Sequence, residues 1–126
     1  MLNFILNFAK ILKKVVFLQP LMIVTFDKDY LRELYVNGRS TSKKHRFQPD
    51  IVSRYIKAVN IMKGANNVLE LYRFKGLNYE QLQGDKKGIS SVRVNDKYRI
   101  EFTESTVENQ HVATICNITE LTNHYQ

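Results

Sequence analysis

Two arginines, Arg93 and Arg99, stand close together in the stretch SVRVNDKYRIEF, in a chain that already carries excess positive charge. Guanidinium groups stabilise the negative charge that develops on a phosphate during its transfer. Cleavage of RNA by its own 2'-hydroxyl needs such cations, a base for the hydroxyl proton and an acid for the 5' leaving oxygen, and it needs no cofactor. The further side chains that suit this chemistry are Glu80, Lys86, Lys87, His124 and Tyr125.

Each of these groups also has an ordinary structural interpretation. Surface arginines are commonly solvated and steadied by an acid such as Glu101, and a His-Tyr pair near a chain end is typical of a frayed tail. A basic run such as KKHR is usually a solvated loop, although in a ribosome-binding protein it could follow RNA phosphates. The basic residues of that run are Lys43, Lys44 and Arg46.

Other common site signatures are missing from the sequence. It has no glycine-rich phosphate loop, no CxxC pair and no HExxH, and its three histidines lack ligand spacing, so we expect no metal and no cofactor. The single cysteine, Cys116, has apolar neighbours that predict an inert buried thiol in a cytoplasmic protein. With 19 Lys and Arg against 12 Asp and Glu, the net charge of +7 favours an anionic partner such as nucleic acid or an acidic protein.

A length of 126 residues predicts one compact domain, but the first 21 residues form a separate problem. The segment MLNFILNFAKILKKVVFLQPL lacks the charge order of a secretory signal and an apolar run of the roughly 20 residues that span a bilayer. It is either an amphipathic helix that docks on a partner or membrane surface, or an extension upstream of a true start at Met22. We favour the second interpretation, which makes residues 22–126 the domain and predicts no membrane partner.

Hydrophobic periodicity predicts an α+β domain, with two helices in the first half and strands in the second. Asp27 is expected to cap the first helix, Asn37-Gly38 to stop it, and Pro49 and Gly64 to begin and end the second helix. A polar loop is expected at RSTSKKHR, a short helical turn over residues 66–74, and a loop from Gly76 onward. The predicted strands are 22–26, 90–94, 98–103 and 112–118, and the predicted helices are 27–36 and 49–64.

The hairpin formed by the predicted strands 90–94 and 98–103 has a predictable register. A three-residue loop at 95–97 pairs Val92 with Ile100, which keeps the apolar side chains of both strands on one face. The same register sets Arg93 directly across from Arg99 on the opposite face. Like charges that face each other across strands repel, so either Glu101 or a bound anion such as a phosphate must compensate.

The block LNYEQLQGDKKGISSVRVNDKYRIEF, followed by a last strand and the ending NHYQ, resembles the HigB toxins of the RelE/ParE superfamily. Members of that family read much like L-x-G-D-(K/R)-x-G-x-x-S-(I/V)-R-(I/V)-N-x-x-(W/Y)-R-(I/L)-x-F. The resemblance implies a RelE-like α+β fold, in which two N-terminal helices pack on a twisted, mostly antiparallel sheet. It also implies a toxin that enters the ribosomal A site and cleaves mRNA, and that a HigA-like helix-turn-helix antitoxin neutralises.

Carried over residue by residue, the family's strand arginine falls on Arg99, and its C-terminal Asp-Tyr-His falls on Asn123, His124 and Tyr125. The family's lysine before Gly-Asp falls on Gln83, and its histidine falls on Glu80, which can serve as the proton acceptor. The resemblance therefore implies catalytic roles for Arg99, His124, Tyr125 and Glu80. The residues expected to bind RNA are Arg93, Lys86, Lys87, Gln83, Asn123, Lys43, Lys44 and Arg46.

Two alternatives remain open at this point: a ParE-like inhibitor of DNA gyrase, and a degenerate toxin that only binds its antitoxin, consistent with Gln83 in place of the family lysine. The nuclease interpretation requires a particular arrangement of these residues. The open face of the sheet must gather the arginines and the last aromatic and imidazole rings around one RNA phosphate. Arg99 is accordingly expected to face outward, without a carboxylate partner, and close to His124 and Tyr125.

Overall fold

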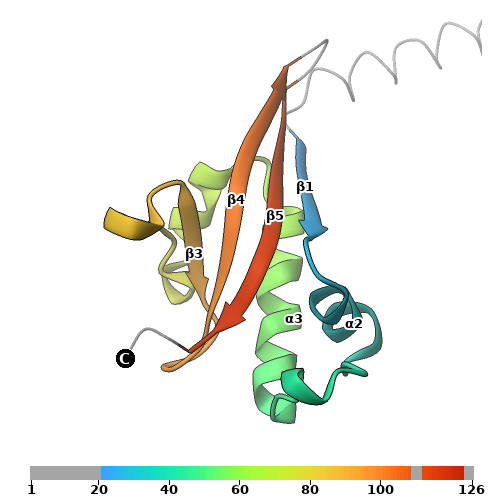
Figure 1. The fold of residues 1–126 in the computed structure, drawn as a ribbon. Helices are drawn as coiled ribbons and strands as arrows, with labels where there is room; N and C mark the ends of the chain where they lie inside the picture. The colour runs from blue at the N-terminus through green and yellow to red at the C-terminus, as the bar shows by residue number, and fades with distance from the viewer. Residues whose placement is uncertain (1–20, 109–111, 124–126) are drawn as a thin grey trace, which may run out of the picture.

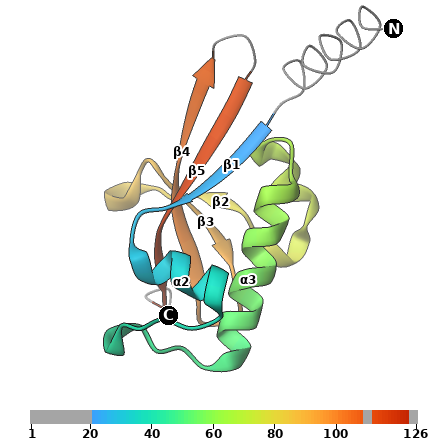
Figure 2. The same ribbon diagram turned by 90° about the vertical axis from the view of Figure 1, so that its right-hand side faces the viewer.

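The computed structural model describes residues 21–108 and 112–123, which form a five-stranded sheet with two α-helices on one of its faces (Figures 1 and 2). Short 3-10 segments connect these elements and carry several of the candidate site residues. The strands are β1 (Leu21–Phe26), β2 (Glu80–Gln81), β3 (Ile89–Arg93), β4 (Arg99–Glu108) and β5 (Val112–Thr122). The helices are α2 (Asp29–Asn37) and α3 (Pro49–Gly64), and the 3-10 segments are η1 (Lys43–His45), η2 (Val68–Arg73), η3 (Lys75–Leu77) and η4 (Gly84–Lys86).

The first strand and helix lie close to their expected places, although α2 begins differently. Asp27 does not cap it, because the helix starts at Asp29 and the capping position falls on Lys28, whose side chain makes no capping hydrogen bond. Asp29 takes the place at the positive end of the helix dipole. The predicted stop is confirmed: Gly38 ends the helix with a φ of 74° in the left-handed region, which glycine adopts without a Cβ clash.

The second helix, α3, has the predicted bounds, with Pro49 in its first turn and Gly64 as its last residue. One face of α3 packs against the sheet, and the buried residues on that face include Val52 and Val59. Ile56 is only partly buried and packs at the edge of the core. The hydroxyl of the fully buried Tyr55 donates to the backbone carbonyl of Leu31 at 2.8 Å, which links α3 to α2.

The strand order is β1-β5-β4-β3-β2, with β1 parallel to β5 and every other pair antiparallel, so the sheet is mostly antiparallel, as expected. Strand β4 runs past its predicted end to Glu108, and Figures 1 and 2 show the end that it shares with β5 projecting beyond the helices. The added residues of β4 belong to the hydrophilic sequence TESTVE, in which hydrophobic periodicity predicts no strand. Strand β5 begins as predicted and continues past Ile118 to Thr122, at the other end of the strand. The two-residue strand β2 lies within the expected loop and was not predicted.

The predicted register of the β3–β4 hairpin is confirmed. Val92 pairs with Ile100, Arg93 pairs with Arg99, and the backbone N–H of Val94 donates to the carbonyl of Tyr98 at 2.9 Å. The three residues between Val94 and Tyr98 form the loop. Val92 and Ile100 are fully buried toward the helices, so the alternate residues of both strands project from the other face of the sheet.

The buried thiol of Cys116 lies in the core formed by α2, α3 and the sheet, as predicted. Burial is the main cause that raises the pKa of this thiol to about 12, and the charge of Glu104 adds to the effect. A thiol with so high a pKa is protonated at neutral pH and is a poor nucleophile. Within the described part of the chain, no helix combines the length and the apolar composition required to cross a membrane.

Candidate functional site

A row of polar side chains lies on the sheet face opposite the two α-helices. Ser91 and Arg93 of β3 alternate with buried Val92, and Arg99 and Glu101 of β4 alternate with buried Ile100, so all four polar residues point away from α2 and α3. Figure 2 shows both helices on the same side of the sheet. The sequence therefore places serine, arginine and glutamate side chains together on the face that the described α-helices leave uncovered.

Arg99 is the most firmly held residue of this face. Its Nε donates to Ser91 Oγ at 2.9 Å, and its Nη2 donates to the carbonyl oxygen of Asn78 at 2.8 Å. Asn78 has a φ of 44°, a left-handed conformation that asparagine adopts more readily than most residues. Nη2 also lies 3.6 Å from Oε1 of Glu80, which is about half exposed. These partners fix the orientation of the guanidinium plane.

The burial of Arg99 differs from the expectation of an outward arginine without a carboxylate partner. Arg99 is only 8% exposed, and Glu80 lies beside it. The physical reason is that a buried guanidinium is tolerated only when its N–H groups have acceptors, and Ser91 and Asn78 supply them. Arg99 was also expected to lie close to His124 and Tyr125, but these two residues lie outside the described residues.

A second ion pair lies on the same face. Lys86, from η4, places its Nζ 2.6 Å from Oε2 of Glu101, whose side chain is 8% exposed. The segment η4 therefore reaches back over the sheet and brings a lysine to the strand that carries Arg99. Each of the two facing arginines has a carboxylate beside it: Arg99 lies beside Glu80, and Arg93 forms an ion pair with Asp96.

Arg93 also borders an open groove of about 820 Å³ at the end of the sheet. Its Nε donates to the carbonyl of Asn95 at 3.1 Å within the hairpin loop. The groove brings Arg93 together with two other predicted RNA-binding residues, Arg46 and Asn123, which come from the segment before α3 and the segment after β5. These three residues are distant in sequence, so only the fold brings them together.

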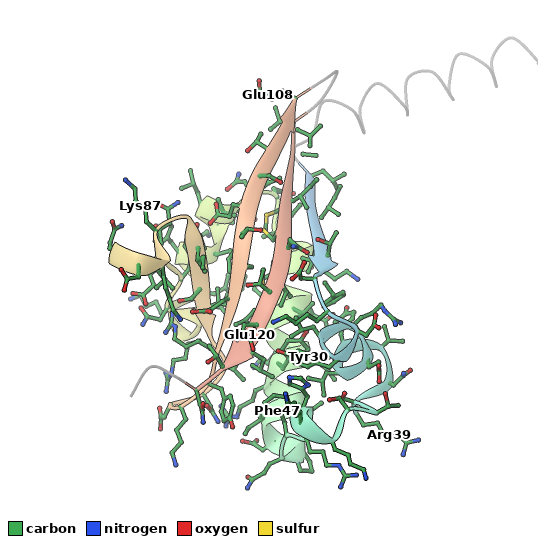
Figure 3. The ribbon with its side chains drawn as sticks, viewed as in Figure 1. Tyr30, Arg39, Phe47, Lys87, Glu108 and Glu120 are labelled. Carbon is green, nitrogen blue, oxygen red and sulfur yellow. The ribbon has the colours of Figure 1, made fainter. Side chains whose placement is uncertain are left out.

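The remaining predicted RNA-binding residues are exposed and lie in two separate places. Gln83 precedes η4 and Lys87 follows it, whereas Lys43 and Lys44 belong to η1 at the other side of the molecule. In Figure 3, Lys87 lies beyond β3, on the opposite side of the molecule from Arg39 and the α2–α3 connection. Gln83 and Lys87 therefore flank the segment that carries Lys86, whereas Lys43 and Lys44 lie apart from it.

Sequence reasoning missed two residues of the arginine site, Ser91 and Asn78. Ser91 alternates with Val92, so its place opposite the core followed from the pattern, but its contact with Arg99 required the register of the hairpin. No signal marked Asn78, because its contribution is a backbone carbonyl in a left-handed conformation.

On the core face, Tyr79 and Ser90 both donate to the carboxylate of Glu104. Burial, together with the hydrogen bond to Glu104, raises the pKa of Tyr79, so its hydroxyl is protonated at neutral pH. This group stands on the opposite side of the sheet from Arg99 and contributes to the fold. Over residues 21–108 and 112–123, no cluster of three or more His, Cys, Asp or Glu side chains could hold a metal ion.

The family model for HigB-like toxins, described as the RelE-like toxin of type II toxin-antitoxin system HigB, matches residues 24–115. This chain belongs to that family. The matched span includes the second half of β1, both α-helices, strands β2 to β4 and the residues of the arginine site. The HigB-like chain is thus a toxin of a toxin-antitoxin system, and its antitoxin is the partner that such a system implies.

Two solved structures resemble the HigB-like chain distantly. One is a YoeB/ParE toxin from Agrobacterium tumefaciens, with 15% identity, a TM-score of 0.47, and coverage of 82% of this chain and 100% of that chain. The other is a YoeB-YefM complex from Staphylococcus aureus, with 18% identity, a TM-score of 0.41, and coverage of 82% and 98%. Both scores are low, so the family assignment rests on the sequence match. No curated protein sequence matches the chain.

Proposed function

We propose that this HigB-like toxin is a metal-independent endoribonuclease of the cytoplasm that enters the ribosomal A site and cuts mRNA, which stops translation. The observation that carries the proposal is the Arg99 guanidinium, fixed 3.6 Å from the half-exposed carboxylate of Glu80. A fixed cation beside an accessible carboxylate is the pair that attack of a 2'-hydroxyl on its phosphate requires. The net charge of +7 also suits a protein that approaches ribosomal RNA.

In the proposed reaction, the 2'-oxygen attacks the adjacent phosphorus while the bond from phosphorus to the 5'-oxygen breaks. The products are a 2',3'-cyclic phosphate and a 5'-hydroxyl. Glu80 takes the proton of the 2'-hydroxyl, and Arg99 stabilises the charge on the phosphoryl oxygens. Because Arg99 keeps its hydrogen bonds to Ser91 and Asn78, its guanidinium can exchange the Glu80 contact for a phosphate oxygen and stay in place.

The other site residues extend the same proposal. Lys86 lies on the Arg99 face and supplies the positive charge that the family lysine, replaced here by Gln83, would provide. His124 and Tyr125 receive their roles, proton donation to the leaving oxygen and stacking on a base, from the family resemblance alone. A HigA-like helix-turn-helix protein is the proposed antitoxin.

The test is cleavage of a defined mRNA on programmed ribosomes by the purified full chain. The wild type is expected to cut, and Glu80→Gln to cut about 10²–10⁴ times more slowly, the usual contribution of a positioned base. The matched control is Glu108→Gln, which removes an exposed carboxylate at the far end of β4 (Figure 3) and should leave the rate unchanged.

Two outcomes would overturn the proposal: intact mRNA with the wild type, or an unchanged rate with Glu80→Gln. If mRNA stays intact while the protein blocks supercoiling by DNA gyrase, the ParE-like alternative takes its place.

The burial of Arg99 favours a second candidate, a degenerate toxin that binds its antitoxin and no longer cuts RNA. At 8% exposure and with a carboxylate beside it, the guanidinium is satisfied within the fold. This candidate predicts that the wild type leaves mRNA and gyrase untouched, yet forms a stable complex with the product of the neighbouring antitoxin gene.

A further inference from the structure

The groove of about 820 Å³ beside the hairpin has the composition of a binding site for a polyanion. Its walls come from the segment before α3, the first turns of α3, the β3–β4 hairpin and the residue after β5. Sites for small molecules and cofactors commonly measure roughly 300–1,000 Å³, so the groove can hold a unit of the size of a nucleotide. Four of its lining residues are cationic: Arg46, Arg54, Arg93 and Lys97.

Two of these cations have no carboxylate partner among the described residues. Arg54 lies 3.3 Å from Asp50 and Arg93 contacts Asp96, whereas Arg46 and Lys97 form no ion pair within residues 21–108 and 112–123. Both are exposed and both line the same groove, so their charges face solvent there. A phosphate placed between them gains two favourable contacts and breaks no existing pair.

The strand register places the groove next to the arginine site. Arg93 pairs directly with Arg99 across β3 and β4, and Thr122, the neighbour of the groove residue Asn123, pairs with Arg99 across β4 and β5. Of the two residues paired with Arg99, one lines the groove and the other directly precedes a residue that lines it. An RNA strand with one phosphate at Arg99 therefore has its neighbouring nucleotides at the groove.

The groove also offers groups that suit nucleic acid better than an acidic protein. Phe47 and Tyr98 stand on its wall, with ring centroids 5.7 Å apart and an interplanar angle of 82°. Figure 3 places Phe47 near the start of α3. Aromatic faces stack on unpaired bases, and side-chain amides such as those of Asn95 and Asn123 bond to base edges. An acidic protein segment would pair with the cations, but it would make no use of the aromatic rings and the side-chain amides.

We propose that this groove binds the RNA strand next to the reacting phosphate, with a phosphate between Arg46 and Lys97 and a base against Phe47 or Tyr98. The inference rests on the proposed function, since it assigns the neighbouring subsite of the same strand. The occupant is therefore the phosphodiester chain of the mRNA, and ribosomal RNA is the alternative that the test must separate from it.

The test uses the full chain and measures affinity against salt for two probes, a 2'-O-methylated single-stranded RNA oligonucleotide and ribosomes without mRNA. In Arg46→Gln/Lys97→Gln, the slope of log affinity against log salt should be less steep by about 0.7, since each neutralised phosphate of a single strand contributes about 0.7 and these two side chains share one phosphate. The matched control is Arg73→Gln/Lys75→Gln, which removes the same charge from exposed positions outside the groove and should leave the slope close to the wild-type value.

A less steep slope with the oligonucleotide is the expected result and assigns the groove to mRNA. A less steep slope with vacant ribosomes alone overturns that assignment, because it marks ribosomal RNA as the occupant. Equal slopes for both double variants with both probes overturn the inference. The inference is also overturned if Arg46→Gln/Lys97→Gln loses affinity only for a third probe, poly-L-glutamate, because that result marks an acidic protein as the occupant. Wild-type cleavage on programmed ribosomes is scored separately, so intact mRNA counts against the proposed function and an unchanged slope counts against the groove.

Discussion

The central residue of the account is Arg99, an arginine buried in a sheet face yet supplied with acceptors. Burial of a charged group is costly unless hydrogen bonds replace the lost water. Ser91 and the carbonyl of Asn78 provide two such bonds, and Glu80 provides a counter-charge. The arrangement holds the guanidinium in one orientation, which is the property that a phosphate-binding group needs for catalysis.

Ser91→Ala should therefore lower both stability and activity. The loss of Oγ leaves the Nε–H of Arg99 without its acceptor in a buried place, at a cost of about 1–3 kcal/mol in the free energy of unfolding. Urea unfolding measures this cost, and Ser91→Thr should recover part of it because it restores a hydroxyl. Ser105→Ala, at an exposed position of β4, should change the free energy by no more than about 0.5 kcal/mol. Equal effects of the two alanine variants would contradict the assigned contact.

Alkaline pH should destabilise the protein through Cys116. Burial raises the pKa of this thiol from 9.0 to about 12, so between these values the unfolded chain loses the proton while the folded chain keeps it. The unfolded state then binds fewer protons, so the contribution of Cys116 to stability is constant below pH 9 and is lost as the pH rises toward 12. Tyr30, whose pKa burial raises to about 12, adds to the fall above pH 10. In Cys116→Ala the decline that begins near pH 9 should be smaller; an identical decline would show that other groups cause it.

At the scale of elements, the β3–β4 hairpin shows what the sequence determines. Alternating apolar residues fix which face each strand buries, and a slip of one residue would expose Ile100 or Val92, so the register was predictable. The facing arginines followed directly from that register. Helix α3 was equally predictable, because Pro49, Gly64 and the apolar spacing agree.

Other features depended on interactions that a local pattern does not contain. Strand β2 has two exposed residues and exists because it pairs with Ser90 and Ser91 of β3. The burial of Arg99 depends on a backbone carbonyl, that of Asn78, from the preceding loop. The groove joins segments that are far apart in the chain, so only the folded structure could bring Arg46 to Arg93 and Asn123.

Asn95→Ala should weaken the hairpin loop. Oδ1 of Asn95 accepts from the backbone N–H groups of Lys97 and Tyr98 at 2.9 and 2.7 Å, which fixes the three-residue loop. Loss of two hydrogen bonds of about 0.5–1.5 kcal/mol each should lower the free energy of unfolding and speed amide exchange in β3 and β4. Asn95→Asp keeps an oxygen acceptor and should remain close to the wild type. Exchange rates in Asn95→Ala that match the wild type would show that the strands alone define the loop.

At the scale of the whole molecule, one core holds α2, α3 and the sheet together, and the charged groups gather on the other sheet face and at its end. Met22 of β1 is buried and its sulfur lies 3.8 Å from the thiol of Cys116, so the described fold has its first core residue at position 22. That residues 22–126 form the domain stays a prediction.

A chain that begins at Met22 should fold and cut RNA like the full chain. Of the described residues it lacks only Leu21, which is 47% exposed and contributes little to the core. Thermal unfolding and the ribosomal cleavage assay test this expectation together. A large loss of thermal stability would show that the first 21 residues belong to the folded unit.

The central claim is that Arg99 and Glu80 promote attack by the RNA's own 2'-hydroxyl, and the product ends of a cut mRNA test it most directly. On programmed ribosomes, the wild type should leave a 2',3'-cyclic phosphate on the upstream fragment and a 5'-hydroxyl on the downstream one. An mRNA with a single 2'-deoxy substitution at the cut position should stay intact. Cleavage of the 2'-deoxy substrate at the same position and rate would contradict the account.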